Sequence, residues 1–245
     1  DGQEIEAAAK EIRENGYLIL PSYLSSEAVE KGAEEIDLRL RRLEFTSPTL
    51  GQNLIDRIEH KYLIDNNLYG TPADFLKQGI AFENESIGGL EEALIKYRPS
   101  TLTLPIKSND RATFSHWLDP FLLQVISSYM GLLPFLTEAY IRRNYPADFQ
   151  TMNHFWHRDL NHPFHLLKVF IFFSDCTLKT GPHEFITGSH RDFTVSGKRY
   201  FSESEVTRQP GKPIKSVVKA GTVIIEDTRG LHRACSPEQS FRDLG

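Results

Sequence analysis

The chain has 245 residues and a formal net charge of −5, with 40% hydrophobic and 25% charged residues. This is the composition of a globular protein, and it excludes a disordered, collagen-like or coiled-coil chain. The acidic balance argues against nucleic acid as a partner, and no apolar run is long enough to predict a membrane span. Only two cysteines occur, which favours a reducing cytoplasmic location over an oxidising one.

The N-terminal part of the sequence is predicted to be helical. Apolar residues recur at helical spacing between Ile5 and Ile12, and Gly16 is typical of a helix end. A short strand is predicted over 17–20. A second amphipathic helix is predicted over 29–43, where apolar residues alternate in steps of four and three.

The middle of the sequence carries weaker signals. Residues 46–112 show no clear periodicity, and we expect them to build a lid over a site. Asp119 followed by Pro120 is typical of the N-cap and first position of a helix, and Gly131 is typical of its end.

From residue 137 onward the sequence favours short strands separated by turn residues. Helices followed by several short strands indicate an α+β protein, mainly β, with a sandwich or barrel core. The predicted strands cover Glu138–Tyr145, Phe155–Leu160, His165–Ser174, His183–Thr187, Ile214–Lys219 and Thr222–Glu226.

Four histidines lie close together in the sequence: His154, His157, His162 and His165. A histidine taken alone is more often structural than functional. His157 and Asp159 are more informative because residues two apart on a strand point to the same side. An imidazole and a carboxylate placed in this way can bind one metal ion, although so short a pattern also occurs by chance.

A third ligand would have to come from elsewhere in the sequence, and His232 follows an apolar predicted strand. Two histidines and one carboxylate that leave other positions open are typical of non-haem Fe(II) oxygenases. Zinc more often takes four ligands including cysteine, and Cys176 and Cys235 lack zinc-site spacing. The sequence therefore favours Fe(II) at His157, Asp159 and His232.

An iron site of this kind can take a 2-oxo acid, whose distal carboxylate needs a cation, ideally a guanidinium. Arg242 follows His232 at a distance that lets it return on the next strand. Taken alone, Arg242 would more often be a surface arginine. Arg233 is adjacent to His232 and would point the opposite way on a strand.

Four segments of the sequence now form a pattern. They are Glu14–Pro21, the Trp-His-Arg-Asp run at 156–159, Gly181–Arg191 with its Gly-Ser-His-Arg end, and Gly221–His232 followed by Phe241-Arg242. In this order they resemble the phytanoyl-CoA dioxygenase family of Fe(II)/2-oxoglutarate-dependent oxygenases. Two positions depart from the family pattern: Thr187 stands where proline is usual, and Ala234 where a hydroxyl residue is frequent.

The resemblance implies a double-stranded β-helix, a jelly-roll or cupin-like barrel, buttressed by N-terminal helices. We expect one dioxygenase domain over 1–245, with helical support and lid in 1–135 and the barrel core in 136–245. The implied cofactor set is Fe(II) on His157, Asp159 and His232, with 2-oxoglutarate as cosubstrate and O2 as oxidant.

The resemblance also implies how the cosubstrate and the substrate are held. Arg242 would anchor 2-oxoglutarate. Asn144 and Arg142 alternate onto one face of a predicted strand, so Asn144 is expected to contact 2-oxoglutarate and Arg142 an anionic substrate. An ordinary polar strand face explains these two residues about equally well.

The expected function is oxidation, most simply hydroxylation, of an unactivated C–H bond in a small organic molecule, with release of succinate and CO2. Desaturation, epoxidation or cyclisation on the same iron stay open, as does a non-catalytic metal- or sugar-binding jelly roll. We expect a small-molecule partner, no nucleic acid, no membrane, and a monomer or homodimer. Aromatic residues in the expected lid favour an apolar or ring-bearing substrate, or else ordinary core packing: Tyr62, Tyr69, Phe75 and Phe82.

Overall fold

The computed structural model describes residues 1–42, 45–46, 86–87, 90–97, 100–106, 110, 115–147, 150, 152–159, 166–192 and 198–245. Most of the expected lid, including its four aromatic residues Tyr62, Tyr69, Phe75 and Phe82, lies outside the described residues. His162 and His165 also lie outside them. Among the described residues, no helix is long and apolar enough to cross a membrane.

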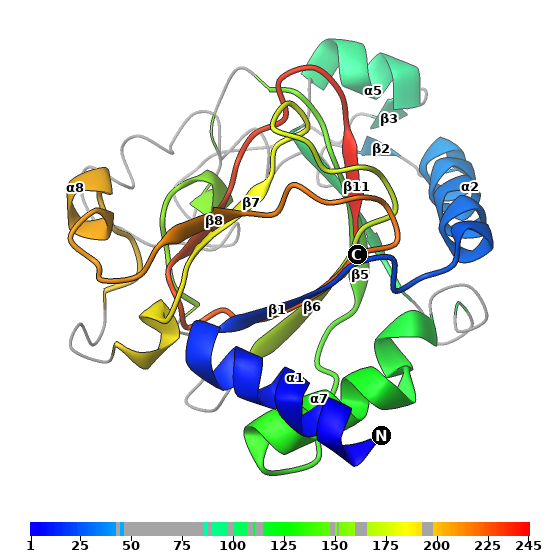
Figure 1. Ribbon diagram of the computed structural model, residues 1–245. Coiled ribbons are helices and arrows are strands. Elements are labelled where there is room, and N and C mark those ends of the chain that lie inside the picture. The colour runs from blue at the N-terminus through cyan, green and yellow to red at the C-terminus, as the bar shows by residue number, and fades with distance from the viewer. Residues whose placement is uncertain are drawn as a thin grey trace.

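The strands form antiparallel sheets (Figure 1). One sheet has the order β1-β9-β6, with β1 at Tyr17–Leu20, β9 at Val223–Asp227 and β6 at Leu167–Ile171. A second has the order β10-β7-β8, at His232–Ala234, His183–Ile186 and Pro213–Lys215. A third has the order β11-β5-β4, at Arg242–Leu244, Tyr140–Asn144 and Thr101–Pro105. A short pair joins β2, Phe45–Thr46, to β3, Ser86–Ile87.

The helices begin and end largely where the sequence predicts. Helix α1, Gly2–Asn15, starts at a capping box on Asp1 and ends at Gly16, whose φ of 86° is left-handed. Helix α7, Pro120–Met130, starts at Asp119, whose carboxylate accepts from the N–H groups of Phe121 and Leu122, and ends at Gly131. The other helices are α2 at Ser26–Arg42, α5 at Leu90–Tyr97 and α8 at Glu203–Val206, with 3-10 turns η2 at Ser115–Leu118, η3 at Met152–His154 and η4 at Ser189–Arg191.

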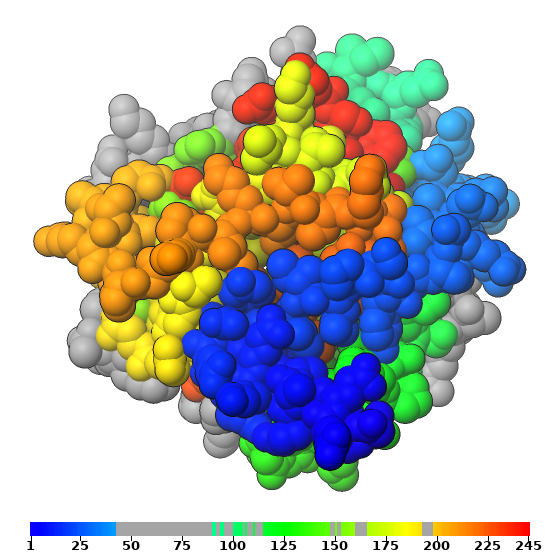
Figure 2. All heavy atoms as spheres, viewed as in Figure 1, coloured from blue at the N-terminus to red at the C-terminus, as the bar shows by residue number. Residues whose placement is uncertain are grey.

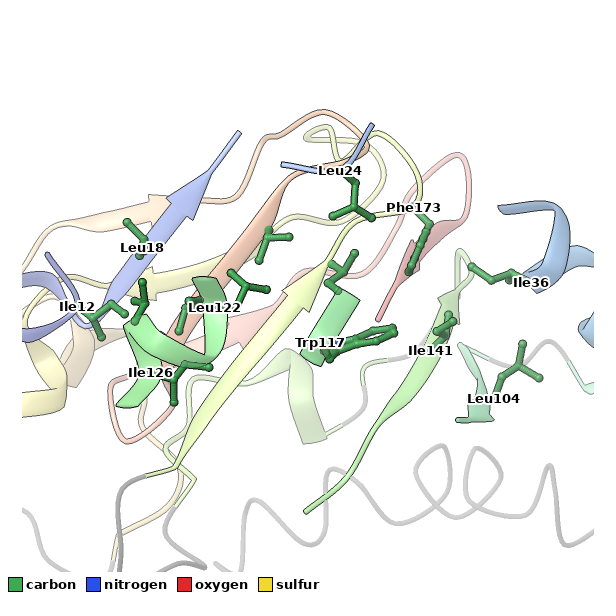
Figure 3. Close-up of a cluster of buried hydrophobic side chains, with 14 of the residues drawn as sticks. Ile12, Leu18, Leu24, Ile36, Leu104, Trp117, Leu122, Ile126, Ile141 and Phe173 are labelled. Carbon is green, nitrogen blue, oxygen red and sulfur yellow. The ribbon is translucent and has the colours of Figure 1, made fainter. Parts of the chain in front are cut away.

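A hydrophobic core lies between the sheets and the helices (Figure 3). Alternate residues of β1, β9 and β6 face Ile12 of α1 and Leu122 of α7, which are fully buried. On the third sheet, Ile141 joins the same core, into which α2 places Ile36. Each large aliphatic side chain removed from water in this way contributes about 1.5–3 kcal/mol to folding. The strand residues between them must therefore point away from the helices, into the interior between the sheets.

Side chains of the remaining strand positions line that interior. Phe172, Cys176 and Ile224 form a small buried cluster there, and Leu244 of β11 packs against it. Strands β6 and β9 on one side and β5 and β11 on the other thus face each other with the sides that do not contact the helices. We call the space lined by these faces the interior.

The segment that follows β1 lies against the turn that precedes β9. The backbone N–H of Leu24 donates to the carbonyl of Gly221 at 2.9 Å, and the space-filling view shows the blue and orange segments in contact (Figure 2). This contact holds β1 beside β9 in the first sheet.

One predicted strand is wrong. Among the described residues 155–159 only His157 takes part in isolated bridges, and the 3-10 turn η3 lies just before them. The backbone groups of this segment bond to several separate segments: His157 to His232, Arg158 to Arg199 and Asp159 to Thr228. A β-strand pairs with one neighbouring strand over several residues, whereas the backbone of this segment bonds to a different part of the chain at each of three residues.

Candidate metal centre and cosubstrate site

The side chains of His157, Asp159 and His232 meet at one place. One ligand atom from each lies within 4.8 Å of the others, and no other such group of three occurs among the described residues. His232 begins β10, and its backbone forms an isolated bridge with His157. The Asp159 N–H donates to the carbonyl of Thr228 at 2.9 Å, which ties the third residue to the loop between β9 and β10.

Backbone carbonyls fix the tautomer of both imidazoles. His157 Nδ1 lies 2.8 Å from the Phe155 carbonyl, and His232 Nδ1 lies 2.9 Å from the Gly230 carbonyl. A carbonyl oxygen only accepts, so each Nδ1 carries the hydrogen and each Nε2 has a free lone pair. The two Nε2 atoms lie 4.0 and 3.8 Å from the Asp159 carboxylate oxygens. Three lone-pair donors thus converge, and this donor set fits a divalent iron ion.

The electrostatics of the three residues favour the protonation states that a metal requires. Burial lowers the pKa of His157 to about 4 and holds the pKa of His232 well below its usual range. Burial alone would raise the pKa of Asp159, but the Lys168 ammonium and the two histidines lower it further than burial raises it. Lys168 Nζ lies 2.5 Å from Asp159 Oδ2. At neutral pH the imidazoles are therefore neutral and the carboxylate is ionised.

The second feature is the buried guanidinium of Arg242 on β11. Arg242 is 2% exposed and is the Cα partner of Asn144 across β11 and β5. Its Nη2 donates to Asn144 Oδ1 at 3.3 Å, while Nε and Nη1 are buried without a hydrogen-bond partner. Burial lowers the pKa of Arg242. Buried donors without acceptors are costly, so this guanidinium fits an anionic ligand such as a carboxylate.

Asn144 lies beside Arg242. Its Nδ2 donates to Thr101 Oγ1 at 2.9 Å, and its Oδ1 accepts from Arg242. The amide therefore orients the guanidinium, and Nδ2 carries a second hydrogen for another acceptor.

Arg233 has a different environment. Its Nε lies 2.6 Å from Glu184 Oε2, its Nη1 bonds to Glu203, and its guanidinium stacks 4.5 Å from the Trp156 ring. Two carboxylates already satisfy this arginine, whereas Arg242 keeps two buried nitrogen atoms without an acceptor.

Three ionisable residues of the interior escaped sequence reasoning. Lys168 of β6 is the Cα partner of Glu226 of β9, and both point into the interior. Glu226 Oε2 lies 2.8 Å from His183 Nε2, and the His183 ring lies 5.5 Å from the His232 ring. The sequence could have pointed to two of them, because Lys168 and Glu226 are charged residues within predicted strands that are otherwise apolar.

A cavity of about 920 Å³ opens beyond the ends of β5 and β10. Its walls include Tyr145, which follows Asn144, and Ala234, which lies two residues beyond His232 on the same face of β10. His154 and Ser236, whose side chains lie within hydrogen-bond distance, form another part of the wall. The cavity is large enough for a small organic molecule, and its walls include residues at and beyond the ends of β5 and β10 rather than the three candidate ligands themselves.

Comparison with known proteins agrees with this geometry. The sequence model described as phytanoyl-CoA dioxygenase matches residues 12–236. No curated protein matches the chain.

Solved structures share the fold at low sequence identity. The non-haem alpha-ketoglutarate-dependent epimerase SnoN from nogalamycin biosynthesis superposes with a TM-score of 0.61 at 15% identity, over 100% of this chain and 82% of SnoN. HygX from Streptomyces hygroscopicus with nickel, 2-oxoglutarate and hygromycin B gives 0.57 at 16%, over 97% and 84%. EctD from S. alaskensis with 2-oxoglutarate and 5-hydroxyectoine gives 0.57 at 17%, over 96% and 73%.

Proposed function

The chain belongs to the phytanoyl-CoA dioxygenase family of iron- and 2-oxoglutarate-dependent oxidoreductases, and we propose that it hydroxylates an unactivated C–H bond of a small organic molecule. One observation carries this proposal: the metal-ligand cluster and an unsatisfied buried arginine occur together. A histidine–aspartate–histidine cluster with free lone pairs lies in the same interior as a buried guanidinium with free donors.

In this proposal His157, Asp159 and His232 hold the iron, and Arg242 with Asn144 holds the distal carboxylate of 2-oxoglutarate. When bound, iron and cosubstrate supply an oxidation in which O2 is consumed, 2-oxoglutarate becomes succinate and CO2, and one oxygen atom enters the substrate.

The residues of the chain supply binding, orientation and exclusion of water. The Phe155 and Gly230 carbonyls keep the two imidazoles turned with Nε2 toward Asp159. Buried apolar side chains of the interior, among them Phe172 and Ile224, keep water away from the cosubstrate. The cavity beside Ala234 receives the substrate.

The architecture proposed for this site is a double-stranded β-helix. The antiparallel sheets with facing inner surfaces support it, and α1 and α7 buttress the outer face of β1-β9-β6. We place the support and lid in 1–135 and the barrel core in 136–245 of one domain, in a cytoplasmic monomer or homodimer that acts on a small molecule.

A second candidate is a different outcome on the same iron, namely desaturation, epoxidation or cyclisation. The solved structures of similar fold support this second candidate, because one, SnoN, is named as an epimerase and another, SnoK, as a carbocyclase. A non-catalytic binding protein is the least supported candidate, since it has no use for a buried arginine with free donors beside a three-ligand cluster.

The proposal is tested by anaerobic titration of the protein with Fe(II) and then 2-oxoglutarate, followed by exposure to O2 and assay of succinate. We expect stoichiometric binding of both and slow succinate release without substrate, which candidate substrates accelerate. Product analysis then separates hydroxylation from the second candidate. Binding of iron without any effect of 2-oxoglutarate would overturn the proposal.

A further inference from the structure

The arginines of the protein differ in how their charge is balanced. Most of those that are buried or half-buried form an ion pair with a carboxylate: Arg13, Arg39, Arg143, Arg158, Arg229 and Arg233. In the described part of the chain, Arg142, Arg199 and Arg242 form no such pair. Arg242 is the proposed anchor of the cosubstrate, and Arg142 lies next to it.

Arg142 points into the interior. Its neighbours Ile141 and Arg143 point the other way, toward the helix-facing core and the Asp37 carboxylate of α2. Arg142 therefore shares the inner face of β5 with Asn144. The Cα partner of Arg142 is Leu244, and Arg242 lies two residues before Leu244 on β11. The two arginines are therefore diagonal neighbours across the two strands.

The Arg142 side chain is held in place but not satisfied. Its guanidinium stacks 4.5 Å from the ring of Tyr140, on the same face of the strand. Its Nε is buried and has no hydrogen-bond partner. Stacking on a ring fixes the plane of a guanidinium and leaves its N–H edge directed outward, which is the arrangement that binds a carboxylate or phosphate.

The carboxylates of the interior already have partners. Lys168 lies beside Asp159 and His183 beside Glu226, whereas neither Arg142 nor Arg242 forms an ion pair with a described carboxylate, and both have buried nitrogen atoms without an acceptor. A cosubstrate carboxylate bound by Arg242 would leave the Arg142 guanidinium without a partner. An unpaired charge in a largely desolvated space is unfavourable, so a further anion is expected when the site is filled.

We propose that the substrate carries an anionic group, a carboxylate or a phosphate, that Arg142 binds. This inference rests on the proposed function and adds the class of substrate to it. Arg242 already presents two free donors, which match one cosubstrate carboxylate. Arg142 thus remains for the substrate.

The test uses the full chain loaded with Zn(II) and saturating 2-oxoglutarate, so that Arg242 is occupied. Benzoate, phenyl phosphate and uncharged benzamide serve as probes, and their affinities are measured by saturation-transfer NMR. The variants are Arg142→Gln and Arg142→Lys. The control is Arg208→Gln, because Arg208 is exposed and its Nε donates to the Ser204 carbonyl.

We expect benzoate or phenyl phosphate to bind at least about tenfold tighter than benzamide, a difference of about 1.4 kcal/mol. The stronger of the two anions identifies the group. Arg142→Gln should abolish the difference, Arg142→Lys should keep part of it, and Arg208→Gln should leave it unchanged. Equal affinity of all three probes, no binding by any, or anion binding that persists in Arg142→Gln would overturn the inference.

Cosubstrate affinity separates the two proposals. If Arg142→Gln weakens 2-oxoglutarate binding as strongly as Arg242→Gln does, Arg142 belongs to the cosubstrate site and the inference is wrong. If the wild-type protein binds neither metal nor 2-oxoglutarate, the proposed function fails instead.

Discussion

His157 and His232 exchange two backbone hydrogen bonds, at 2.9 Å from His157 N to His232 O and 3.0 Å in return. Residues paired in this way across an antiparallel bridge carry their side chains on the same side. Their ring centroids accordingly lie 4.2 Å apart. The backbone thus sets the spacing of the two imidazoles before any ion binds, and it joins residues far apart in the sequence.

His157→Ala and His232→Ala should each abolish stoichiometric binding of Fe(II). Each change leaves only two of the three ligand side chains, which hold a labile ferrous ion poorly. Anaerobic dialysis followed by metal analysis measures the occupancy. His154→Ala is the control, because His154 lies nearby but interacts with Ser236 instead. Full occupancy in both ligand variants would rule out this metal centre.

Arg242→Gln should weaken 2-oxoglutarate binding by roughly a hundredfold or more. Removing one partner of a desolvated ion pair costs about 3–5 kcal/mol, and each 1.4 kcal/mol is about tenfold in affinity. Iron content should not change. The matched variant Arg233→Gln removes an arginine that is already bound to Glu184 and Glu203 and should leave the affinity unchanged. Greater damage from Arg233→Gln would show that the anchor is misassigned.

Tyr129→Phe should destabilise the protein by about 1.5–3 kcal/mol at neutral pH, because the Tyr129 hydroxyl donates to the fully buried Asp227 carboxylate at 2.5 Å. Burial alone would raise the pKa of Asp227, but hydrogen bonds from Arg229 and Tyr129 lower it. A lowered folded-state pKa stabilises the protein above the ordinary aspartate value and ceases to do so as the pH falls through it.

Urea unfolding of wild type and Tyr129→Phe at neutral and strongly acidic pH measures this effect. The penalty should shrink in acid, where Asp227 takes up a proton. A penalty that stays constant across the whole pH range would mean that the hydroxyl acts through packing rather than through the carboxylate.

Gly16→Ala should cost more stability than Gly131→Ala, although both glycines end helices at positive φ, 86° and 70°. A Cβ at Gly16 would lie 2.5 Å from His190 Nδ1 and 2.7 Å from the Phe185 ring, whereas a Cβ at Gly131 would meet nothing within 4 Å. Left-handed backbone alone costs about 1–2 kcal/mol for alanine. The difference between the two urea midpoints measures the clash, and equal midpoints would show that the rings move aside.

Local signals in the sequence account for much of the fold. Gly16 and the Asp119–Pro120 pair set helix ends by backbone rules that need no distant partner, and both predictions are confirmed. The Phe155–Leu160 segment was predicted wrongly because its hydrogen bonds go to three separate segments, which no periodicity encodes.

The candidate site likewise has one part that could be predicted from the sequence and one part that could not. The ligand residues have a sequence pattern, and the structure brings His157, Asp159 and His232 together. The ion pair between Lys168 and Asp159 and the contact of His183 with Glu226 depend on the register of β6 with β9 and on the packing of β7. Register follows from the whole core, so these partners could not be predicted from the sequence.

The Lys168 ammonium beside Asp159 changes what metal uptake means for this protein. Without a nearby cation, the buried Asp159 carboxylate would be left uncompensated whenever the metal left, at a cost to the stability of the fold. Here an internal cation stays on the carboxylate, and the side chain is 36% exposed, so it can swing toward solvent. Loading would then be an ion exchange, in which a divalent ion would take the place of the tethered Lys168 ammonium beside Asp159. The protein should consequently survive chelation in a folded state and recover its metal on dialysis, with an uptake rate governed by the departure of the lysine.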